Sequence, residues 1–559
     1  MRDNSTILHR LQTWAMDQPE QAALYHQEAD HSWKPITSRA YWLQTVRFAL
    51  ALQESGIQAG DRVMIYALNS PEWIQWELAT WLAGAISVGL HPNTPGIDLS
   101  RMVDSSKPKL ILLESDLFRE KIQQETQSDA TLLTFLEAVQ NMLGALSGDE
   151  AQLLARGTAL LQKVDSSKPQ MVIFTSGTTG HPKGVMLGLR QLTYVADSLS
   201  REWNLPFMDG VLFSFLPLAH VAEKIQTIAV AISQRYAVWF NSRYERFLPE
   251  LKEVRPTFLL AVPRVWERFK EQVESQKPKI LQRIMEFEKV GSFAEKLYLS
   301  QVREQLGLDR VRIAVSGAVK LAPPIAEWFM SLGIEIQEIY GMSESGGLVT
   351  LTHPGRKNFE SVGQPAGGVE VKITPGGEIW VKGPNIFFGY WNDPEATAAT
   401  LLEDGWLKTG DLGEWTPELR IIGRNRDIIK LSSGRMLAPL PIENALKEIP
   451  EISNVCIVGE GKSHPLALIT LKEQVLMEYK FVPGAIEGLA VEDENLKRKI
   501  AKEIETLYDQ KKITEKITRF VILSRDFLGD LQELTPTQKL NRNRIQQNFK
   551  HFINLQFEG

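Results

Sequence analysis

The sequence predicts an α/β protein. A large N-terminal domain of helix-covered, mainly parallel sheets, with a small β subdomain at its end, precedes a small α+β C-terminal domain. Short β-prone apolar runs alternate with stretches of helical period through the first 345 residues, which is typical of parallel sheets covered by helices. After about residue 361, glycine-punctuated strands replace the helical spacing. In folds of this class, ligands bind at the carboxyl ends of the strands.

The expected strands of the first part are short apolar runs. They span residues 62–67, 109–113, 170–174, 211–216, 257–262, 311–315 and 335–339. A helix is expected between the third and fourth of these runs, because apolar residues from Leu192 to Trp203 recur at the three-to-four spacing of one helical face.

The second part begins near residue 361. Strands at 370–374 and 378–382 are separated by Pro375-Gly376-Gly377, which is a hairpin signal. We therefore expect a β subdomain over residues 361–424, within an N-terminal domain of residues 1–425. Residues 426–559 are expected to form a separate domain, because strands at 454–458 and 466–471 are followed by a helix at 495–509.

Composition narrows the class of protein. The 559 residues carry 62 Lys and Arg against 68 Asp and Glu, and 43% of them are hydrophobic, which excludes a disordered chain and argues against nucleic acid as a partner. The single cysteine, Cys456, excludes an intrachain disulfide, and its apolar neighbours predict a core residue. The longest uncharged apolar stretch, 78–90, is well short of the ~20 residues that span a bilayer. We expect a cytoplasmic protein; peripheral contact with the inner face of a membrane and a homodimeric state stay open.

The richest local motif follows the strand expected at 170–174. It reads Thr175-Ser176-Gly177-Thr178-Thr179-Gly180-His181-Pro182-Lys183-Gly184. Glycines let backbone N–H groups turn toward an anion, hydroxyls donate to phosphate oxygens, and a lysine adds positive charge. The spacing differs from the Walker A pattern, since Gly184 follows the lysine where Ser or Thr would stand. The motif therefore predicts a polyphosphate-binding loop of another kind.

A second motif is Tyr340-Gly341-Met342-Ser343-Glu344. An aromatic face suits a nucleobase, while a hydroxyl and a carboxylate suit phosphate and Mg²⁺. The alternative of a hydrolase nucleophile elbow with Ser343 as nucleophile needs glycine at the fifth position, where this chain has Ser345.

These motifs occur in the order found in the adenylate-forming enzymes, which include acyl-CoA and aryl-CoA synthetases, luciferases and the adenylation domains of peptide synthetases. The chain resembles that superfamily from about residue 60 to residue 545, and the resemblance includes the segments 409–412, 423–424 and 534–540. It implies ATP, Mg²⁺ and coenzyme A as cofactors and a mobile C-terminal domain.

The resemblance also implies which residues surround the nucleotide. They are Thr175, Ser176, Gly177, Thr178, Thr179, Gly180, Lys183, Ser316, Gly317, Ala318, Tyr340, Gly341, Ser343, Asp411 and Arg424. In this set, Tyr340 stacks on adenine, Asp411 binds the ribose hydroxyls with help from Arg424, and Ser343 contacts the adenylate. The superfamily more often has threonine where this chain has Ser343, so the hydroxyl is kept.

Catalytic roles follow from the same resemblance. Glu344 holds Mg²⁺, and Lys183 offsets phosphate charge. Lys539 is the catalytic lysine that bridges the carboxylate substrate and the α-phosphate. Gly434 lets the pantetheine arm of coenzyme A pass close to the backbone in the second half-reaction. Arg426 stands at the hinge, where the superfamily commonly has Asp or Lys.

The acyl group is indicated by two further segments. Residues 216–223 and 262–268 resemble those of long-chain fatty acyl-CoA synthetases, which implies that His220, Val221 and Arg264 line the substrate pocket. The expected function is therefore ligation of a long-chain fatty acid to coenzyme A through an acyl-adenylate. Two alternatives stay open: a fatty acyl-AMP ligase that delivers the acyl group to a carrier protein, and a catalytically silent nucleotide sensor.

Overall fold

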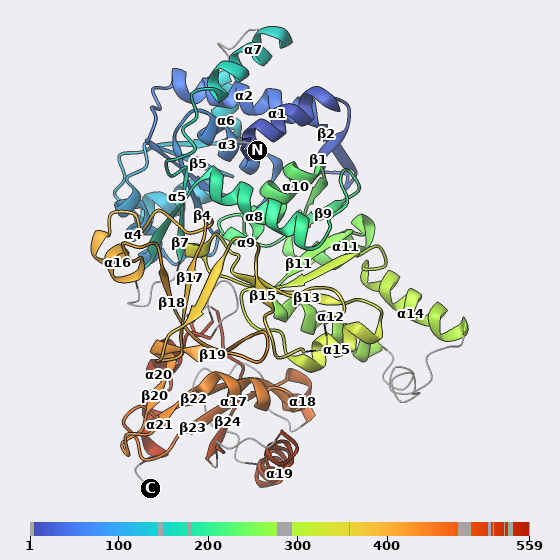
Figure 1. The fold of residues 1–559 in the computed structure, drawn as a ribbon, viewed down its shortest axis with the longest axis vertical. Helices are drawn as coiled ribbons and strands as arrows, with labels where there is room; N and C mark the ends of the chain where they lie inside the picture. Colours follow the sequence, from blue (N-terminus) through green and yellow to red (C-terminus); the bar gives the residue numbers. More distant parts are fainter. Residues whose placement is uncertain are drawn as a thin grey trace.

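The computed structural model describes residues 5–143, 149–175, 181–276, 293–356, 358–478, 493–511, 516–517, 519–529, 531–534 and 540–557. The chain runs from the N-terminal sheets at the top of Figure 1, through the β subdomain, to the C-terminal elements at the bottom. Within these residues, none of the helices combines the length and the apolar character that crossing a bilayer requires.

The first large sheet is parallel except at one edge. Its strands lie in the order β6-β5-β3-β4-β7-β8, and only β7 and β8 pair antiparallel. The strands are β3 (Arg62–Tyr66), β4 (Ile86–Leu90), β5 (Leu110–Leu113), β6 (Thr131–Thr134), β7 (Met171–Thr175) and β8 (Lys183–Leu187).

The second large sheet has the order β15-β14-β13-β12-β11-β9-β10-β1-β2, with parallel pairing from β13 to β1 and antiparallel pairing at both edges. Its strands are β1 (Ala22–Gln27), β2 (Trp33–Thr37), β9 (Val211–Ser214), β10 (Ala237–Phe240), β11 (Phe258–Ala261), β12 (Ile313–Ser316), β13 (Ile336–Tyr340), β14 (Thr350–Leu351) and β15 (Gln364–Pro365).

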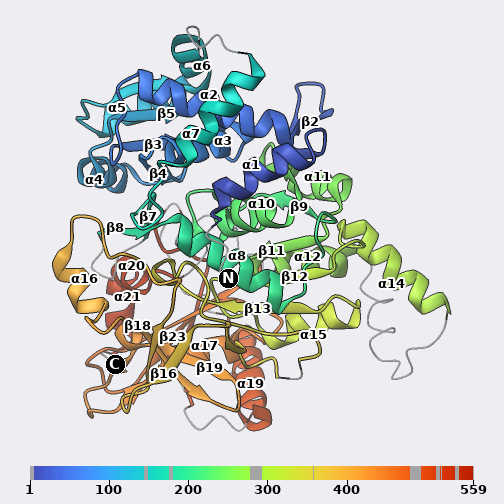
Figure 2. The same cartoon turned by 45° about the horizontal axis from the view of Figure 1, so that its top comes forward.

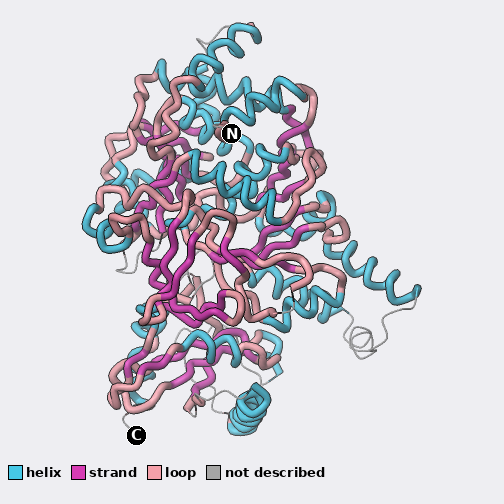
Figure 3. Tube along the Cα trace, viewed as in Figure 1, coloured by secondary structure: helices cyan, strands magenta, loops and turns pink. Residues whose placement is uncertain are grey.

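Helices cover both faces of these sheets, and Figure 3 shows strands inside and helices outside. Val63 and Ile65 of β3 belong to the core shared with α2 and α3, whereas Met64 and Tyr66 belong to the core of α4 and α5. This alternation follows from the two-residue period of a strand. The helices are α1 (Ile7–Asp17), α2 (Ser38–Glu54), α3 (Pro71–Leu82), α4 (Gly96–Ser106), α5 (Asp116–Glu125), α6 (Phe135–Leu143), α7 (Glu150–Leu161), α8 (Leu189–Glu202), α9 (Val221–Lys224), the π-helix η1 (Ile225–Val230), α10 (Ala231–Gln234), α11 (Phe247–Val254), α12 (Pro263–Gln276), α14 (Phe293–Leu306) and α15 (Pro323–Ser331).

The β subdomain is an antiparallel sheet in the order β16-β17-β18-β19, and in both Figure 1 and Figure 2 it lies near the C-terminal elements. Its inward residues, Ile379, Val381, Leu407 and Leu419, join the core of the N-terminal sheets. The elements are β16 (Glu370–Ile373), β17 (Glu378–Lys382), α16 (Pro394–Thr400), β18 (Leu407–Trp415) and β19 (Leu419–Arg424).

The C-terminal sheet has the order β22-β23-β24 and packs helices on both faces. Cys456 is fully buried on the face of α20 and α21, and burial raises the pKa of its thiol to about 12, so its prediction as a core residue is confirmed. The Nζ of Lys447 lies 3.8 Å from Oε1 of Glu267 on α12. The elements are β20 (Ile429–Lys430), β21 (Met436–Leu437), α17 (Pro439–Leu446), β22 (Ile452–Val458), β23 (Leu466–Leu471), α18 (Glu473–Glu478), α19 (Glu494–Lys511), β24 (Phe520–Leu523), α20 (Arg542–Asn548) and α21 (Lys550–Leu555).

The predicted strands are confirmed with small shifts at their ends, as β3, β5, β7, β9, β11, β12 and β13, and the predicted hairpin is β16–β17. The predicted helix at 192–203 is α8. The edge strand β2 was not predicted, because its residues are half-buried or exposed and give no apolar run. The strand β4 was also missed, because its apolar residues continue those at the end of α3.

Candidate active site

The two described ends of the glycine-rich motif pair antiparallel at one edge of the first sheet. Thr175, the last residue of β7, pairs with Lys183, the first residue of β8, and the Thr175 hydroxyl donates to the Lys183 carbonyl at 3.5 Å. Ser176, Gly177, Thr178, Thr179 and Gly180 lie outside the described residues. The structure therefore places the two stems of the predicted loop, with Lys183 on the second stem.

Lys183 and Glu344 contact the same tyrosine. The Nζ of Lys183 lies 5.0 Å from the ring centroid of Tyr390, within the range of a cation–π interaction. The Tyr390 hydroxyl donates to Oε1 of Glu344 at 2.6 Å. Burial and the neighbouring Glu344 raise the pKa of Tyr390, so the phenol keeps its proton and acts as a donor. The two predicted phosphate-side residues are thus joined through one neutral side chain.

Glu344 retains an oxygen that a cation could bind. The residue is 8% exposed, and within the described part of the chain its Oε2 has no hydrogen-bond partner. Mg²⁺ is usually bound by one or two carboxylates together with substrate phosphates. The described residues contain no group of three His, Cys, Asp or Glu side chains that would form an all-protein site. Glu344 therefore fits a Mg²⁺ that arrives with a polyphosphate.

Tyr340, Asp411 and Arg424 form a second polar group. Asp411 on β18 lies opposite Arg424 on β19, and its Oδ1 lies 2.9 Å from Nε of Arg424. The Tyr340 hydroxyl, at the end of β13, donates to Oδ2 of Asp411 at 2.8 Å. The negative charge of Asp411 is the main reason that the pKa of Arg424 is raised. The pKa of Tyr340 is also raised, mainly by burial of its hydroxyl. A carboxylate accepts about four hydrogen bonds, so Asp411 keeps capacity for a diol.

The two groups are adjacent, because Tyr340 ends β13 and Glu344 lies in the turn that follows it. Glu344 also contributes to the raised pKa of Arg424. Ser343, 7% exposed, stands between Tyr340 and Glu344 in the 3₁₀ turn η3 (Ser343–Ser345). A side chain at Gly341 would bring its Cβ to 2.4 Å from the Gly347 carbonyl, so only glycine fits where this segment folds back on itself.

The predicted adenine loop lies at the carboxyl end of β12, the neighbour of β13. Ser316 is 1% exposed, and its Oγ has no hydrogen-bond partner in the described residues. Such a group costs free energy unless a partner satisfies it, so a polar ligand atom would stabilise it. Gly317 follows, and Ala318 adopts a left-handed backbone with φ of 70°. Strained backbone of this kind is common at ligand sites.

The C-terminal candidates are placed only in part. Arg426 lies in the 3₁₀ turn η4 (Asn425–Asp427) with its side chain 43% exposed, and burial and the nearby Arg424 lower its pKa. Gly434 has φ of 83° in the turn between β20 and β21, a conformation that favours glycine. Lys539 lies outside the described residues.

The predicted acyl-pocket residues do not form one cluster of described contacts. His220 caps α9, since its Nδ1 accepts from the Ala222 N–H at 3.3 Å. The side chain of Val221 lies close to Gly347, which follows the turn that carries Glu344. Arg264 lies on α12 and pairs with carboxylates of its own helix, Glu267 at 3.1 Å and Glu271 at 3.5 Å.

Sequence reasoning missed Tyr390 and a buried ion pair between Lys224 and Glu77. The side chain of Lys224 is 1% exposed and that of Glu77 is fully buried, and Nζ of Lys224 lies 2.5 Å from Oε1 of Glu77. Tyr390 lies in a run of aromatic residues whose meaning depends on a contact with Glu344, 46 residues earlier. No local pattern predicts either pairing.

The fold and the site define the class of protein. The protein-family model for AMP-binding enzymes matches residues 11–391 of the sequence. The family model for the AMP-binding enzyme C-terminal domain matches residues 426–559. The chain belongs to the AMP-binding enzyme family.

Among curated relatives, the chain is 30% identical over 563 residues to a long-chain-fatty-acid–CoA ligase, FadD15, of Mycobacterium bovis, covering 94% of this chain and 93% of that protein. It is 27% identical to the human long-chain-fatty-acid–CoA ligase ACSBG2, and the alignment covers 93% of this chain and 88% of that protein. Among solved structures, ATP-bound MatB from Rhodopseudomonas palustris superposes with a TM-score of 0.74 at 22% sequence identity. The match covers 98% of this chain and 100% of that one. A carboxylic acid reductase didomain from Segniliparus rugosus, solved with AMP, has a TM-score of 0.77 at 21% sequence identity. The match covers 100% of this chain and 82% of that one. The structural likenesses show the shared fold.

Proposed function

We propose that the protein is an AMP-forming long-chain fatty acid–CoA ligase, which joins a fatty acid to coenzyme A through an acyl-adenylate. The observation that carries the proposal is the end of β13 and the turn that follows it: the Tyr340 hydroxyl donates to Asp411, and Oε2 of Glu344 has no hydrogen-bond partner among the described residues. Long-chain-fatty-acid–CoA ligases among the curated relatives, similar over nearly the whole chain, support the choice of acid and acceptor.

In the first step, the fatty acid carboxylate attacks the α-phosphorus of ATP and pyrophosphate leaves. Asp411 accepts from the ribose hydroxyls, and the fixed ring of Tyr340 orients the base. Lys183 pairs with phosphate oxygens. Glu344 would hold Mg²⁺, which neutralises phosphate charge when bound. By resemblance we assign to Lys539 the bridge between the carboxylate and the α-phosphate, where it offsets developing negative charge.

In the second step, the coenzyme A thiol attacks the acyl carbonyl and AMP leaves. One site must then serve two reactions, and Lys539 and Gly434 lie on different segments after residue 426. We propose that residues 426–559 form a domain that reorients between the steps against residues 1–425. The change in backbone torsion would fall at Arg426, because hinges absorb such changes over few residues.

The acyl chain is proposed to lie beside His220, Val221 and Arg264. An apolar site favours long chains, because each buried methylene contributes about 0.8 kcal/mol. We therefore expect long saturated and monounsaturated acids to react faster than acetate and benzoate.

The proposal is tested with a panel of acids, measuring pyrophosphate release and thioester formation with and without coenzyme A. Long-chain acids should release pyrophosphate and yield thioester only with coenzyme A. Pyrophosphate release without thioester would indicate transfer to a carrier protein, and absence of ATP–pyrophosphate exchange with every acid would indicate a nucleotide sensor. A best substrate shorter than about six carbons would contradict the burial argument.

A further inference from the structure

We propose that Tyr390 is a positioning residue that sets the geometry between the cation-binding carboxylate of Glu344 and the phosphate-binding amine of Lys183. The inference rests on the proposed function, because it takes Glu344 as the ligand of a divalent cation and Lys183 as a ligand of the polyphosphate. It adds a residue that lies on neither motif and reaches both.

The backbone around Tyr390 joins the two segments that carry these groups. The Phe387 N–H donates to the Glu344 carbonyl at 2.9 Å, and the Trp391 N–H donates to the Gly184 carbonyl at 2.7 Å. Between these two bonds, Tyr390 forms an antiparallel bridge with Val185 of β8. Residues 387–391 thus lie along β8 at one end and against the turn of Glu344 at the other.

The side chain of Tyr390 repeats this connection. Its hydroxyl donates to Oε1 of Glu344 at 2.6 Å, and its ring lies 5.0 Å from Nζ of Lys183. A hydrogen bond to a carboxylate is stronger and more directional than one between neutral groups. Because Oε1 accepts from the phenol, the orientation of the carboxylate is restrained, and with it the position of Oε2, which has no hydrogen-bond partner in the part of the chain that the structure describes. Partners of this kind orient a metal ligand and tune its affinity.

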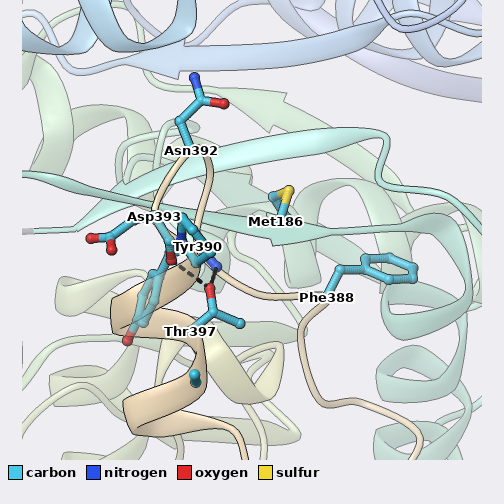
Figure 4. Close-up of a pocket in the computed structure, with 8 residues that line it drawn as sticks. Met186, Phe388, Tyr390, Asn392, Asp393 and Thr397 are labelled. Carbon is cyan, nitrogen blue, oxygen red and sulfur yellow. Dashed lines mark hydrogen bonds between the residues drawn. The ribbon is translucent and has the colours of Figure 1, made fainter.

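Packing and polar contacts together hold Tyr390. Figure 4 shows that Tyr390 borders a cavity that is also lined by Met186 and Phe388. The Tyr390 N–H donates to Oγ1 of Thr397 at 2.9 Å, which fixes the backbone but not the ring. The ring itself is buried and packs edge-on against the ring of Phe387, with 5.0 Å between the two centroids. Packing therefore places the ring, and the hydrogen bond to Glu344 directs its hydroxyl. A role limited to filling the core would not require the hydroxyl.

The test separates the hydroxyl from the ring. Tyr390→Phe removes the donor and keeps the aromatic face beneath Lys183, while Tyr390→Leu removes both. Tyr236→Phe is the matched control, because the Tyr236 hydroxyl is also bonded, to the Pro206 carbonyl, and Tyr236 makes no described contact with Glu344 or Lys183. Mn²⁺ binding to each protein is measured by electron paramagnetic resonance with a non-hydrolysable ATP analogue, without fatty acid or coenzyme A. Analogue affinity is measured separately in EDTA, together with AMP affinity and the melting temperature.

We expect Tyr390→Phe to weaken Mn²⁺ binding about tenfold, the size typical for loss of a partner of a metal ligand, and to leave metal-free analogue affinity unchanged. Tyr390→Leu should weaken both Mn²⁺ binding and the metal-free affinity for the analogue. Tyr236→Phe should change neither. Wild-type Mn²⁺ affinity in a folded Tyr390→Phe variant would overturn the inference, and so would an equal loss of Mn²⁺, analogue and AMP binding.

These readouts are independent of the assignment of acid and acceptor. If the wild-type protein binds Mn²⁺ with the analogue but converts no fatty acid, the proposed function fails while the comparison of variants still decides the role of Tyr390. If the acid panel succeeds and Tyr390→Phe behaves like wild type, only the positioning role fails.

Discussion

Replacing Asp411 by asparagine tests the proposed nucleotide site most directly. The side chain keeps its shape but loses its charge, and one of its two terminal atoms becomes an N–H donor. Asp411 accepts from Tyr340 and pairs with Arg424, so the amide nitrogen must face one of these two donors. The Tyr340 hydroxyl can accept from that nitrogen as well as donate, so a contact to each partner can persist, but the charge-assisted bonds become weaker and the arginine loses its counter-charge.

The magnitude can be estimated from the contacts. A hydrogen bond to a charged group contributes about 1.5–3 kcal/mol. Asp411 is 4% exposed, but the Arg424 side chain is 38% exposed, so solvent screens the ion pair and the loss of folding stability should lie near the lower value, about 1.5 kcal/mol. A ribose hydroxyl that loses a charged acceptor should weaken AMP binding by roughly 10-fold to 150-fold.

The assay is calorimetric titration of AMP and 3′-deoxy-AMP into the wild-type protein and the Asp411→Asn variant. The deoxy nucleotide should bind more weakly than AMP to the wild type and about equally to the variant, because the partner of the hydroxyl is then already lost. This double cycle isolates the contact from general effects on folding. An equal penalty for the deoxy nucleotide in both proteins would refute the assignment of Asp411 to the ribose.

Four further outcomes follow from particular residues. Burial raises the pKa of Glu223 to about 7 from 4.5, so the folded protein holds a proton that the unfolded chain has released, and stability falls by roughly 3 kcal/mol as pH rises through this window. Glu223→Gln should abolish that decline in unfolding measurements from pH 5 to 8. Gly341→Ala should lower stability by about 1–3 kcal/mol, whereas Gly317→Ala, whose Cβ would lie 3.6 Å from its nearest neighbour, should fold normally and raise the ATP KM. Lys539→Ala should abolish adenylation and spare thioester formation from supplied acyl-AMP, since its charge is needed at the α-phosphate. Arg426→Pro should retain acyl-AMP formation and lose the coenzyme A step, because proline locks φ near −65°.

Each of these outcomes has a matched contradiction. An unchanged pH dependence in Glu223→Gln would remove that carboxyl as its source, and equal melting temperatures for Gly341→Ala and Gly317→Ala would contradict the close approach at Gly341. Loss of both half-reactions in Lys539→Ala would indicate a structural or shared role. Arg426→Ala is the control for the hinge, and equal loss of the two half-reactions in a folded Arg426→Pro variant would exclude the hinge at this residue.

The sequence by itself determined the strands that enter the site and the residues at their ends. The apolar runs that became β12 and β13 are local, and Ser316 and Tyr340 stand at their carboxyl ends. The hairpin of β16 and β17 was predictable because its turn residues lie between two strands only a few positions apart. The family resemblance rests on equally local motifs.

Only the tertiary structure decided which of these residues touch. Strand order placed β4 between β3 and β7 and brought the hairpin of Lys183 to the edge of the sheet. The contact of Tyr390 with Glu344 and the pairing of Asp411 with Tyr340 join residues 46 and 71 positions apart. Such contacts depend on how whole faces of sheets and helices bury their apolar residues together, and a local pattern specifies a face without specifying its partner.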